Sequence, residues 1–203
     1  MQILAYRWGV IAMLLLPIPL QPSRRNDQKF AVQRLNESLR AALVAHFLAL
    51  PMRDRSLRFC ASLAPELIKA YVDRIDFDHD AVFGVHDHRH VLIGVAHLAF
   101  TEDLAEVALS VLPAHRDRGV GSALFERAVA HARNRRVPRL FMQFLSGNAP
   151  IMHIAQKFGM GTVTRAGVAE AYLELQPDSL ATIAVAAGEP VEFRPAGSYR
   201  SLQ

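Results

Sequence analysis

Cysteine is nearly absent from this sequence: Cys60 is the only one among 203 residues. A single cysteine excludes an intramolecular disulfide, so the chain shows no need of an oxidising compartment, and we expect a cytoplasmic protein. No base stands beside Cys60 in the sequence, which argues against a catalytic thiol and favours a buried spacer.

Lysine is almost as scarce, occurring only at Lys29, Lys69 and Lys157, so that arginine supplies nearly all of the positive charge. The formal net charge is +4, and the basic residues are scattered along the chain. A nucleic-acid-binding protein would gather them into a patch or stripe. We therefore expect no nucleic-acid partner, although a mild positive balance suits an anionic cofactor.

Long hydrophobic runs are missing as well. Residues 11–20 (IAMLLLPIPL) resemble the apolar part of a signal peptide, yet only Arg7 precedes them as a positive charge and no small-x-small cleavage site follows. The run is also shorter than the roughly twenty residues that span a bilayer. We interpret it as an extension and do not expect a membrane protein; a structural or membrane-associated role rests on this segment alone.

The composition is that of an ordinary globular protein, with 51% hydrophobic and 21% charged residues. Its length allows one well-buried domain with appendages. We expect an N-terminal apolar extension and linker over residues 1–32, a folded domain over 33–175 and a C-terminal extension over 176–203.

The period of the apolar residues changes along the chain. Helical spacing predicts helices over 35–50, 63–75, 121–136 and 148–158. Alternating or continuous apolar segments predict strands over 57–59, 81–85, 91–100, 104–112 and 139–146, with one or two more in 161–175 around Gly167. This order indicates a mixed α/β (α+β) fold with helices on both faces of the sheet.

One loop carries chemical information. A predicted strand ending in SVLP leads into residues 116–121 (RDRGVG), and a predicted helix follows. Gly119 and Gly121 lack the side chains that would keep a phosphate from the backbone, and a helix N-terminus favours an anion by up to about 2 kcal/mol. Arg116 and Arg118 can add charge-assisted hydrogen bonds. A turn of purely structural purpose explains such a loop equally well.

The surroundings of this loop resemble a known family. Arg-x-x-Gly-x-Gly after a strand is similar to the acyl-CoA-binding motif of the GNAT superfamily of N-acetyltransferases. The segment 148–160, in which Asn148 opens a helix closed by a glycine, resembles that superfamily's second signature. Walker and dinucleotide-binding loops fit less well, because no lysine follows Gly121 and Leu124 stands where a third glycine is needed.

The resemblance implies a GNAT-like acyl-CoA N-acyltransferase fold, with a central mixed, mostly antiparallel sheet and helices on both faces. It implies transfer of an acetyl group from acetyl-CoA, the cosubstrate, to a primary amine of a small molecule or protein; a homodimer is compatible with it. It also implies cofactor contacts from two strands, the loop and the second signature: Leu109, Val111, Arg116, Arg118, Gly119, Val120, Gly121, Ser122 and Asn148.

The implied reaction requires a base, since an amine with a pKa near 10.4 is almost entirely protonated at pH 7. Glu106 is the first candidate, because it alternates with core-facing residues on the strand that leads to the loop. A solvated or ion-paired carboxylate is an equal alternative. His97 is the second candidate, although its apolar neighbours favour a histidine satisfied within the core.

One departure from the family bears on activity. Many members carry a Tyr seven residues after the Asn, proposed to protonate the leaving thiolate, and this chain has Ala155 there. On an ideal helix His153 lies about 140° from Asn148, so it is a poor substitute. Since water can also protonate a thiolate, an active enzyme and a non-catalytic acyl-CoA-binding or sensor module both remain open.

A histidine-rich segment, residues 86–90 (HDHRH), has the spacing of a metal tract. Its place between two predicted strands favours a hairpin turn, and no third or fourth ligand is fixed by the sequence. We predict no metal.

Overall fold

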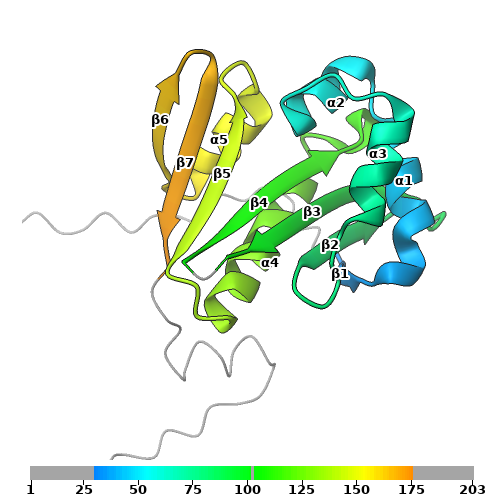
Figure 1. Ribbon diagram of the computed structural model, residues 1–203, viewed down its shortest axis with the longest axis horizontal. Helices are drawn as coiled ribbons and strands as arrows, with labels where there is room; N and C mark the ends of the chain where they lie inside the picture. The colour runs from blue at the N-terminus through cyan, green and yellow to red at the C-terminus, as the bar shows by residue number, and fades with distance from the viewer. Residues whose placement is uncertain (1–29, 102, 176–203) are drawn as a thin grey trace, which may run out of the picture.

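The computed structural model describes residues 30–101 and 103–175, and in these ranges a seven-stranded sheet is flanked by helices (Figure 1). The strands are β1 Val32–Leu35, β2 Ala81–His86, β3 Leu92–Phe100, β4 Leu104–Val111, β5 Arg139–Leu145, β6 Gly161–Arg165 and β7 Val168–Glu174. The helices are α1 Arg40–Ala49, α2 Met52–Phe59, α3 Pro65–Asp73, α4 Val120–Asn134 and α5 Ala149–Lys157, with 3₁₀ turns at Glu37–Leu39 (η1) and Pro113–His115 (η2).

Segment 11–20 and the greater part of the expected extensions, residues 1–29 and 176–203, lie outside the described residues. Of the helices in residues 30–101 and 103–175, none has the length and apolar character needed to cross a bilayer.

The sheet is mixed and mostly antiparallel, with the strand order β1-β2-β3-β4-β5-β7-β6. Its one parallel pair is β4 with β5, which α4 connects, and the other neighbouring pairs are antiparallel. The predicted sheet type is therefore confirmed.

Two hydrophobic clusters lie on the two faces of this sheet. α4 and α5 contribute to the larger one, together with Ala105, Val107 and Leu109 of β4. α1 and α3 contribute to the smaller one, which includes Val95 of β3. Side chains alternate along a strand, so the even-numbered residues of β4 face the α1–α3 side. Helices on both faces were predicted from the element order, and the structure confirms them.

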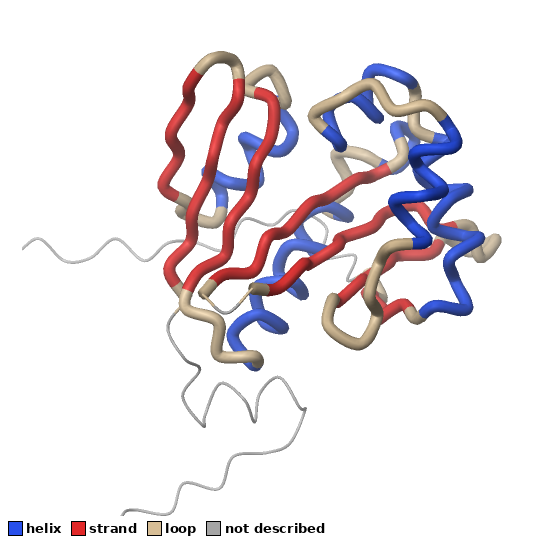
Figure 2. Tube along the Cα trace, in the orientation of Figure 1, coloured by secondary structure: helices blue, strands red, loops and turns tan. Residues whose placement is uncertain are grey.

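Strands β4 and β5 separate beyond their first residues. Their register ends at Glu106 opposite Phe141, whereas β4 continues to Val111 and β5 to Leu145. Figure 2 shows the two strands close together at one end and spread apart at the other. The edge of β4 that would bind β5 is thus free of that strand in its second half.

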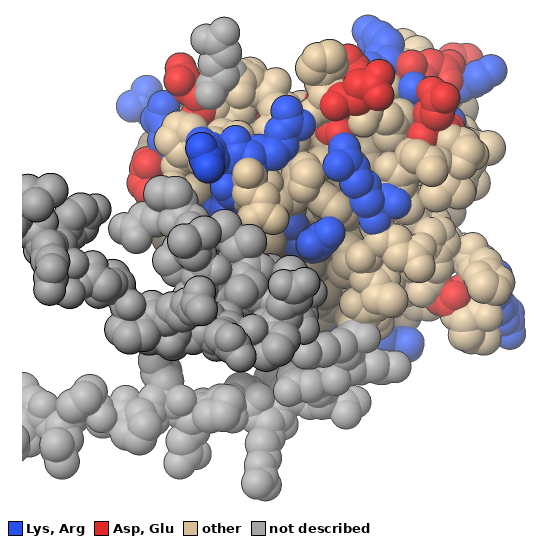
Figure 3. Space-filling model, turned by 90° about the horizontal axis from the view of Figure 1, so that it is seen from below, with Lys and Arg blue, Asp and Glu red and all other residues tan. Residues whose placement is uncertain are grey.

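Charge is mixed on the surface seen from below in Figure 3, where Lys and Arg side chains occupy the middle of the face and acidic side chains lie toward its upper edge.

The segment 86–90 makes the predicted hairpin turn between β2 and β3, with the Asp87 carboxylate accepting hydrogen bonds from the Arg89 and Val91 amides at 2.8 and 2.9 Å. Among the described residues, no group of three or more His, Cys, Asp or Glu side chains is arranged to hold a metal.

Three predictions about the N-terminal part are wrong. Residues 57–59 belong to α2 instead of a strand, because two apolar residues around Arg58 imitate alternation while the segment continues the helix that follows Pro51. β1 was missed, and the first helix begins at Arg40 after an Asn36-capped 3₁₀ turn. Cys60 was expected to be a buried spacer, but it is exposed and ends α2 in a left-handed conformation with φ 52°.

Candidate functional site

The loop after β4 ends in a backbone conformation that only glycine adopts easily. Gly119 caps α4 with φ 92° and ψ 0°, in the left-handed region. The first intrahelical bond runs from the Ala123 amide to the Gly119 carbonyl at 2.9 Å. The amides of Val120, Gly121 and Ser122 therefore form the open N-terminal turn of a 15-residue helix, whose positive end favours an anion.

Gly121 has a different role, which is to leave space. A Cβ at this position would lie 3.0 Å from Ile154 Cδ1 of α5 and 3.8 Å from Val111 Cγ2 of β4. Only bare backbone fits at this crossing of three elements without displacing a neighbour. The sequence predicted one purpose for both glycines, and the structure separates them into conformation at Gly119 and space at Gly121.

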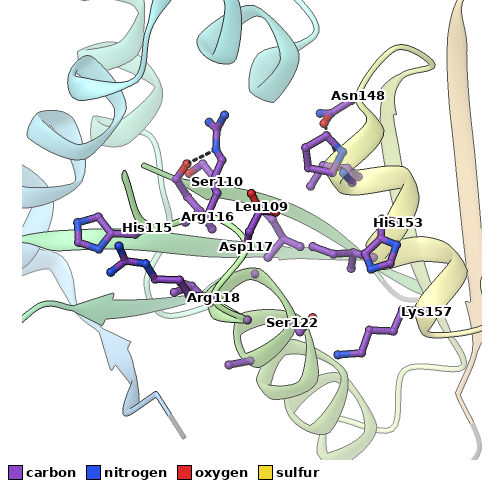
Figure 4. Close-up of a pocket in the computed structure, with 18 of the residues that line it drawn as sticks. Leu109, Ser110, His115, Arg116, Asp117, Arg118, Ser122, Asn148, His153 and Lys157 are labelled. Carbon is purple, nitrogen blue, oxygen red and sulfur yellow. Dashed lines mark hydrogen bonds between the residues drawn. The ribbon is translucent and has the colours of Figure 1, made fainter. Parts of the chain in front are cut away.

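A wide cleft surrounds this helix N-terminus. The structure brings all nine cofactor residues predicted from the sequence onto its wall: Leu109, Val111, Arg116, Arg118, Gly119, Val120, Gly121, Ser122 and Asn148. Basic side chains flank the N-terminus from two sides, His115 and Arg118 from the loop and His153 and Lys157 from α5 (Figure 4). The cleft therefore combines free amides with the cationic side chains of Arg118 and Lys157 and the imidazoles of His115 and His153.

The two arginines of the loop are not equivalent. Arg116 Nε donates to the Val111 carbonyl at 3.0 Å, and its guanidinium pairs with the Asp54 carboxylate at 2.9 Å. These contacts fasten the loop to α2 and use most of the donors of Arg116. Arg118 is exposed at the cleft, which leaves its guanidinium accessible to a ligand.

A narrow gap continues this cleft between the separated strands. It is lined by Val107, Ala108 and Leu109 of β4, Met142, Gln143 and Phe144 of β5, Leu57 and Arg58 of α2, and Asn148 and Ile151 near the start of α5. Asn148 is buried, and its Oδ1 caps α5 by accepting from the Ile151 amide at 3.4 Å. The gap is apolar apart from Arg58, Gln143 and Asn148.

A buried histidine supports the wall of the cleft at Ser110. His46 of α1 is 2% exposed, and its Nδ1 lies 2.8 Å from the Leu92 carbonyl. Because a carbonyl only accepts, Nδ1 carries the proton, and Nε2 then accepts from the Ser110 hydroxyl at 2.8 Å. Burial lowers the pKa of His46 from 6.5 to about 4. The imidazole is therefore neutral at pH 7 and fixes β4 to α1.

This histidine predicts acid sensitivity of the fold. Its pKa is lower in the folded state than in the unfolded chain, so the unfolded state binds more protons between pH 6.5 and 4. The stabilisation is complete above pH 6.5 and decreases as the pH falls, by up to about 3 kcal/mol. We expect the free energy of unfolding, measured in urea, to decrease from pH 7.5 to pH 5.

A His46→Gln variant provides the control. Two other histidines contribute to the same slope: burial lowers the pKa of His131 to about 4, and it lowers the pKa of His97 as well, so the variant should lose part of the pH dependence and keep the rest. An undiminished slope in His46→Gln would contradict the assignment.

The two candidate bases lie on the same face of the sheet but in different surroundings. Glu106 is exposed and precedes Val107, which lines the gap. His97 is half-buried, with its ring between Tyr71 and Asp80: Nδ1 lies 2.7 Å from the Tyr71 hydroxyl and Nε2 lies 2.9 Å from Asp80 Oδ2. Its pKa is lowered, mainly by burial. Both ring nitrogens of His97 therefore have hydrogen-bond partners, and His97 is not among the residues that line the gap.

Ala155 occupies no part of the cleft wall. It is fully buried in the core, so the departure from the family motif leaves no hydroxyl at this position. His153 lines the wide cleft near Lys157, but the narrow gap is lined by other residues. The angle between His153 and Asn148 on an ideal helix predicted that His153 would not replace the missing tyrosine, and His153 is indeed not among the residues that line the gap.

Sequence reasoning missed Arg58, Tyr71 and His46. They come from three different helices, and no local motif contains them. Only the fold brings Arg58 to the gap and His46 to Ser110, so no pattern within the sequence indicates them.

Comparison with known proteins agrees with the architecture. The model of the Acetyltransferase (GNAT) family matches residues 49–160, more than half of the chain. The chain therefore belongs to the acetyltransferase (GNAT) family. This confirms the predicted fold and the predicted class of enzyme, an acyltransferase that uses acetyl-CoA as its cosubstrate.

Solved structures show the same fold. The GNAT domain of S. lividans PAT has a TM-score of 0.61 and 23% identity, covering 71% of this chain and 89% of that one. Spermidine N-acetyltransferase from Vibrio cholerae, in complex with CoA and spermine, has a TM-score of 0.59 and 17% identity, covering 73% of this chain and 97% of that one. The structure of yncA from Salmonella typhimurium, with its cofactor acetyl-CoA, has a TM-score of 0.56 and 15% identity, covering 74% of this chain and 96% of that one. No curated protein sequence matches the chain significantly.

Proposed function

We propose that residues 33–175 form an acetyltransferase domain that transfers the acetyl group of acetyl-CoA to a primary amine of a small molecule or protein. The observation that supports this most directly is the cleft at the start of α4. It joins three free amides, the close-packed Gly121 and flanking cations. A diphosphate matches this set of groups, because successive N–H groups and nearby cations can share its charge.

In this proposal each part of the cleft has a partner on acetyl-CoA. The amides of residues 120–122 and the Arg118 side chain hold the pyrophosphate, and the free edge of β4 near Leu109 and Val111 pairs with the pantetheine arm. Asn148, whose Oδ1 caps α5, offers its amide group to the same arm. The thioester end then enters the gap between β4 and β5.

The amine acceptor approaches the gap from the face that carries Glu106. The carboxylate of Glu106 removes the ammonium proton, directly or through a water, so that the neutral nitrogen attacks the thioester carbonyl. His97, held by Tyr71 and Asp80, is the second candidate for this role. An amine acceptor is also the substrate of two structural neighbours, a spermidine N-acetyltransferase and a ribosomal-protein-S18-alanine N-acetyltransferase.

The proposal is tested by thiol release from acetyl-CoA on a panel of amines that includes polyamines, amino acids and lysine peptides, with mass spectrometry of the product. An acetylated amine with stoichiometric CoA release supports it. The buried Ala155 favours a second candidate, a non-catalytic acyl-CoA sensor. Tight CoA binding in calorimetry with no acetyl transfer to any amine would favour the sensor.

A further inference from the structure

Arg58 is the one charged side chain among the residues that line the gap between β4 and β5. The remaining lining residues of the described chain are apolar, apart from the neutral amides of Gln143 and Asn148. Arg58 also belongs to the wall of the wide cleft. Arg58 is therefore the cationic side chain that the lining of the gap offers to a negative charge formed there.

The guanidinium of Arg58 is held firmly. Its central carbon lies over the rings of Phe47, Phe59 and Tyr71, at 5.5, 4.9 and 5.7 Å from their centroids. Nη2 donates to the Tyr71 hydroxyl at 3.0 Å. The Nε atom is buried and has no hydrogen-bond partner among the described residues. Ring stacking fixes the plane of the group and leaves a donor unused.

A second layer orients Tyr71. Because Arg58 only donates, the Tyr71 oxygen accepts from it, and the Tyr71 O–H is then free to donate to His97 Nδ1 at 2.7 Å. His97 Nε2 donates in turn to the Asp80 carboxylate at 2.9 Å. In this series of three hydrogen bonds each donor has one acceptor. Asp80 and His97 therefore fix the direction of the Tyr71 hydroxyl, and the Tyr71 oxygen in turn fixes the position of the Arg58 guanidinium.

Acetyl transfer creates negative charge in the gap. The acceptor nitrogen forms a C–N bond to the acetyl carbon, the C–S bond breaks, and its electron pair remains on the sulfur. The proton of the amine leaves through the base, and the sulfur later takes a proton from solvent. Ala155 is buried in the core and brings no proton donor to this site.

We propose that Arg58 is a catalytic residue that stabilises the negative charge on the departing sulfur, and that Tyr71, His97 and Asp80 are its positioning residues. This inference rests on the proposed function, because it requires the thiol end of CoA to lie in the gap. A fixed cation in a site with little water is more effective than water at stabilising such charge.

The test measures the thiol of bound CoA, so it needs no turnover. The ultraviolet absorbance of the thiolate is followed against pH for CoA bound to the protein, with the protein alone subtracted to remove Cys60. In the wild type we expect the pKa of the bound thiol to be lower than that of free CoA in the same buffer. In Arg58→Met it should return to the free value, and Arg58→Lys should keep part of the shift.

Arg53→Met is the matched control, because Arg53 is an exposed arginine on the same helix, outside the lining of the gap and cleft. It should leave the thiol pKa unchanged. Arg58→Met should also lower kcat about a hundredfold or more with little change in the KM for acetyl-CoA. Tyr71→Phe should raise the thiol pKa partway, which loss of packing alone would not do.

The possible failures are distinguishable. If CoA binds with the same thiol pKa in the wild type and Arg58→Met, the role of Arg58 is overturned while the proposed function stands. If the wild type does not bind CoA in calorimetry, both proposals are overturned. Should Arg58→Met fail to fold, Arg58→Lys against Arg53→Met decides the question, since a thiol pKa equal to that of free CoA in Arg58→Lys would overturn the electrostatic role.

Discussion

Replacing Gly121 with Val is expected to abolish measurable binding of CoA, with the dissociation constant rising a hundredfold or more. The new Cβ would lie 3.0 Å from Ile154 Cδ1 and 3.8 Å from Val111 Cγ2, so the valine would fill space between lining residues of the cleft, beside the amides of the first turn of α4. A phosphate could then no longer approach those amides. The measurement is calorimetric titration of CoA into wild type and variant.

The fold should survive this change. The closest atom to the added Cβ is the tip of a flexible isoleucine side chain, which can rotate away, and Gly121 lies within a helix where Val is allowed. We expect the far-ultraviolet circular dichroism to be unchanged and the unfolding midpoint to fall only modestly. Gly147→Val is the matched control, because a side chain at Gly147 would meet no atom within 4 Å. Equal CoA affinity in Gly121→Val and the wild type would remove the loop from its role.

The fold was predictable where the sequence is continuous and strongly patterned. β2 to β5 and α4 are long, apolar on at least one side and separated by polar or proline-containing breaks, so their periods identify them. β1 has four residues, of which only Leu35 is buried, and is stabilised by pairing with β2. Such a strand depends on a partner some fifty residues away, which a local pattern does not reveal.

The residues of the site likewise fall into those that a local pattern predicted and those that depend on distant partners. The loop 116–121 and Asn148 were predicted because their chemistry is written in contiguous residues: glycines before a helix and an N-cap. Arg58 was not predicted as a site residue, because its helix was predicted to be a strand and because its side-chain position depends on Tyr71, His97 and Asp80. These four residues come from α2, α3, β3 and the segment before β2. Only the packing of α2 and α3 on the sheet joins them.

The register of the sheet also explains why one face receives the acceptor in our proposal. His97 lies opposite Ala108, and Ala99 lies opposite Glu106, so these side chains share the face that α1 and α3 cover in part. Glu106 stands at the last paired position before β4 and β5 separate. The Glu106 carboxylate is exposed and adjoins Val107 of the gap lining, where we propose that the acceptor nitrogen enters.

Changing Glu106 to Gln is accordingly expected to lower kcat about a hundredfold at pH 7 on whichever amine proves to be a substrate. The side-chain shape is kept while the ability to accept a proton is lost. As the pH rises toward 10.4, the ordinary pKa of an alkylamine, the acceptor supplies its own neutral form. The ratio of wild-type to variant rate should therefore shrink with increasing pH, which steady-state rates measured between pH 7 and 9.5 will show.

Asp103→Asn is the matched control, since Asp103 is an exposed carboxylate that immediately precedes β4. It carries the same change of charge close to the same strand but lies away from the gap, so its rate should stay near that of the wild type at every pH. A normal rate for Glu106→Gln would remove Glu106 as the base and leave His97, reached through Tyr71, as the group to be changed next. A hundredfold loss that persists unchanged at high pH would instead mean that Glu106 binds the acceptor, because a binding contact is needed whether or not the amine is already neutral.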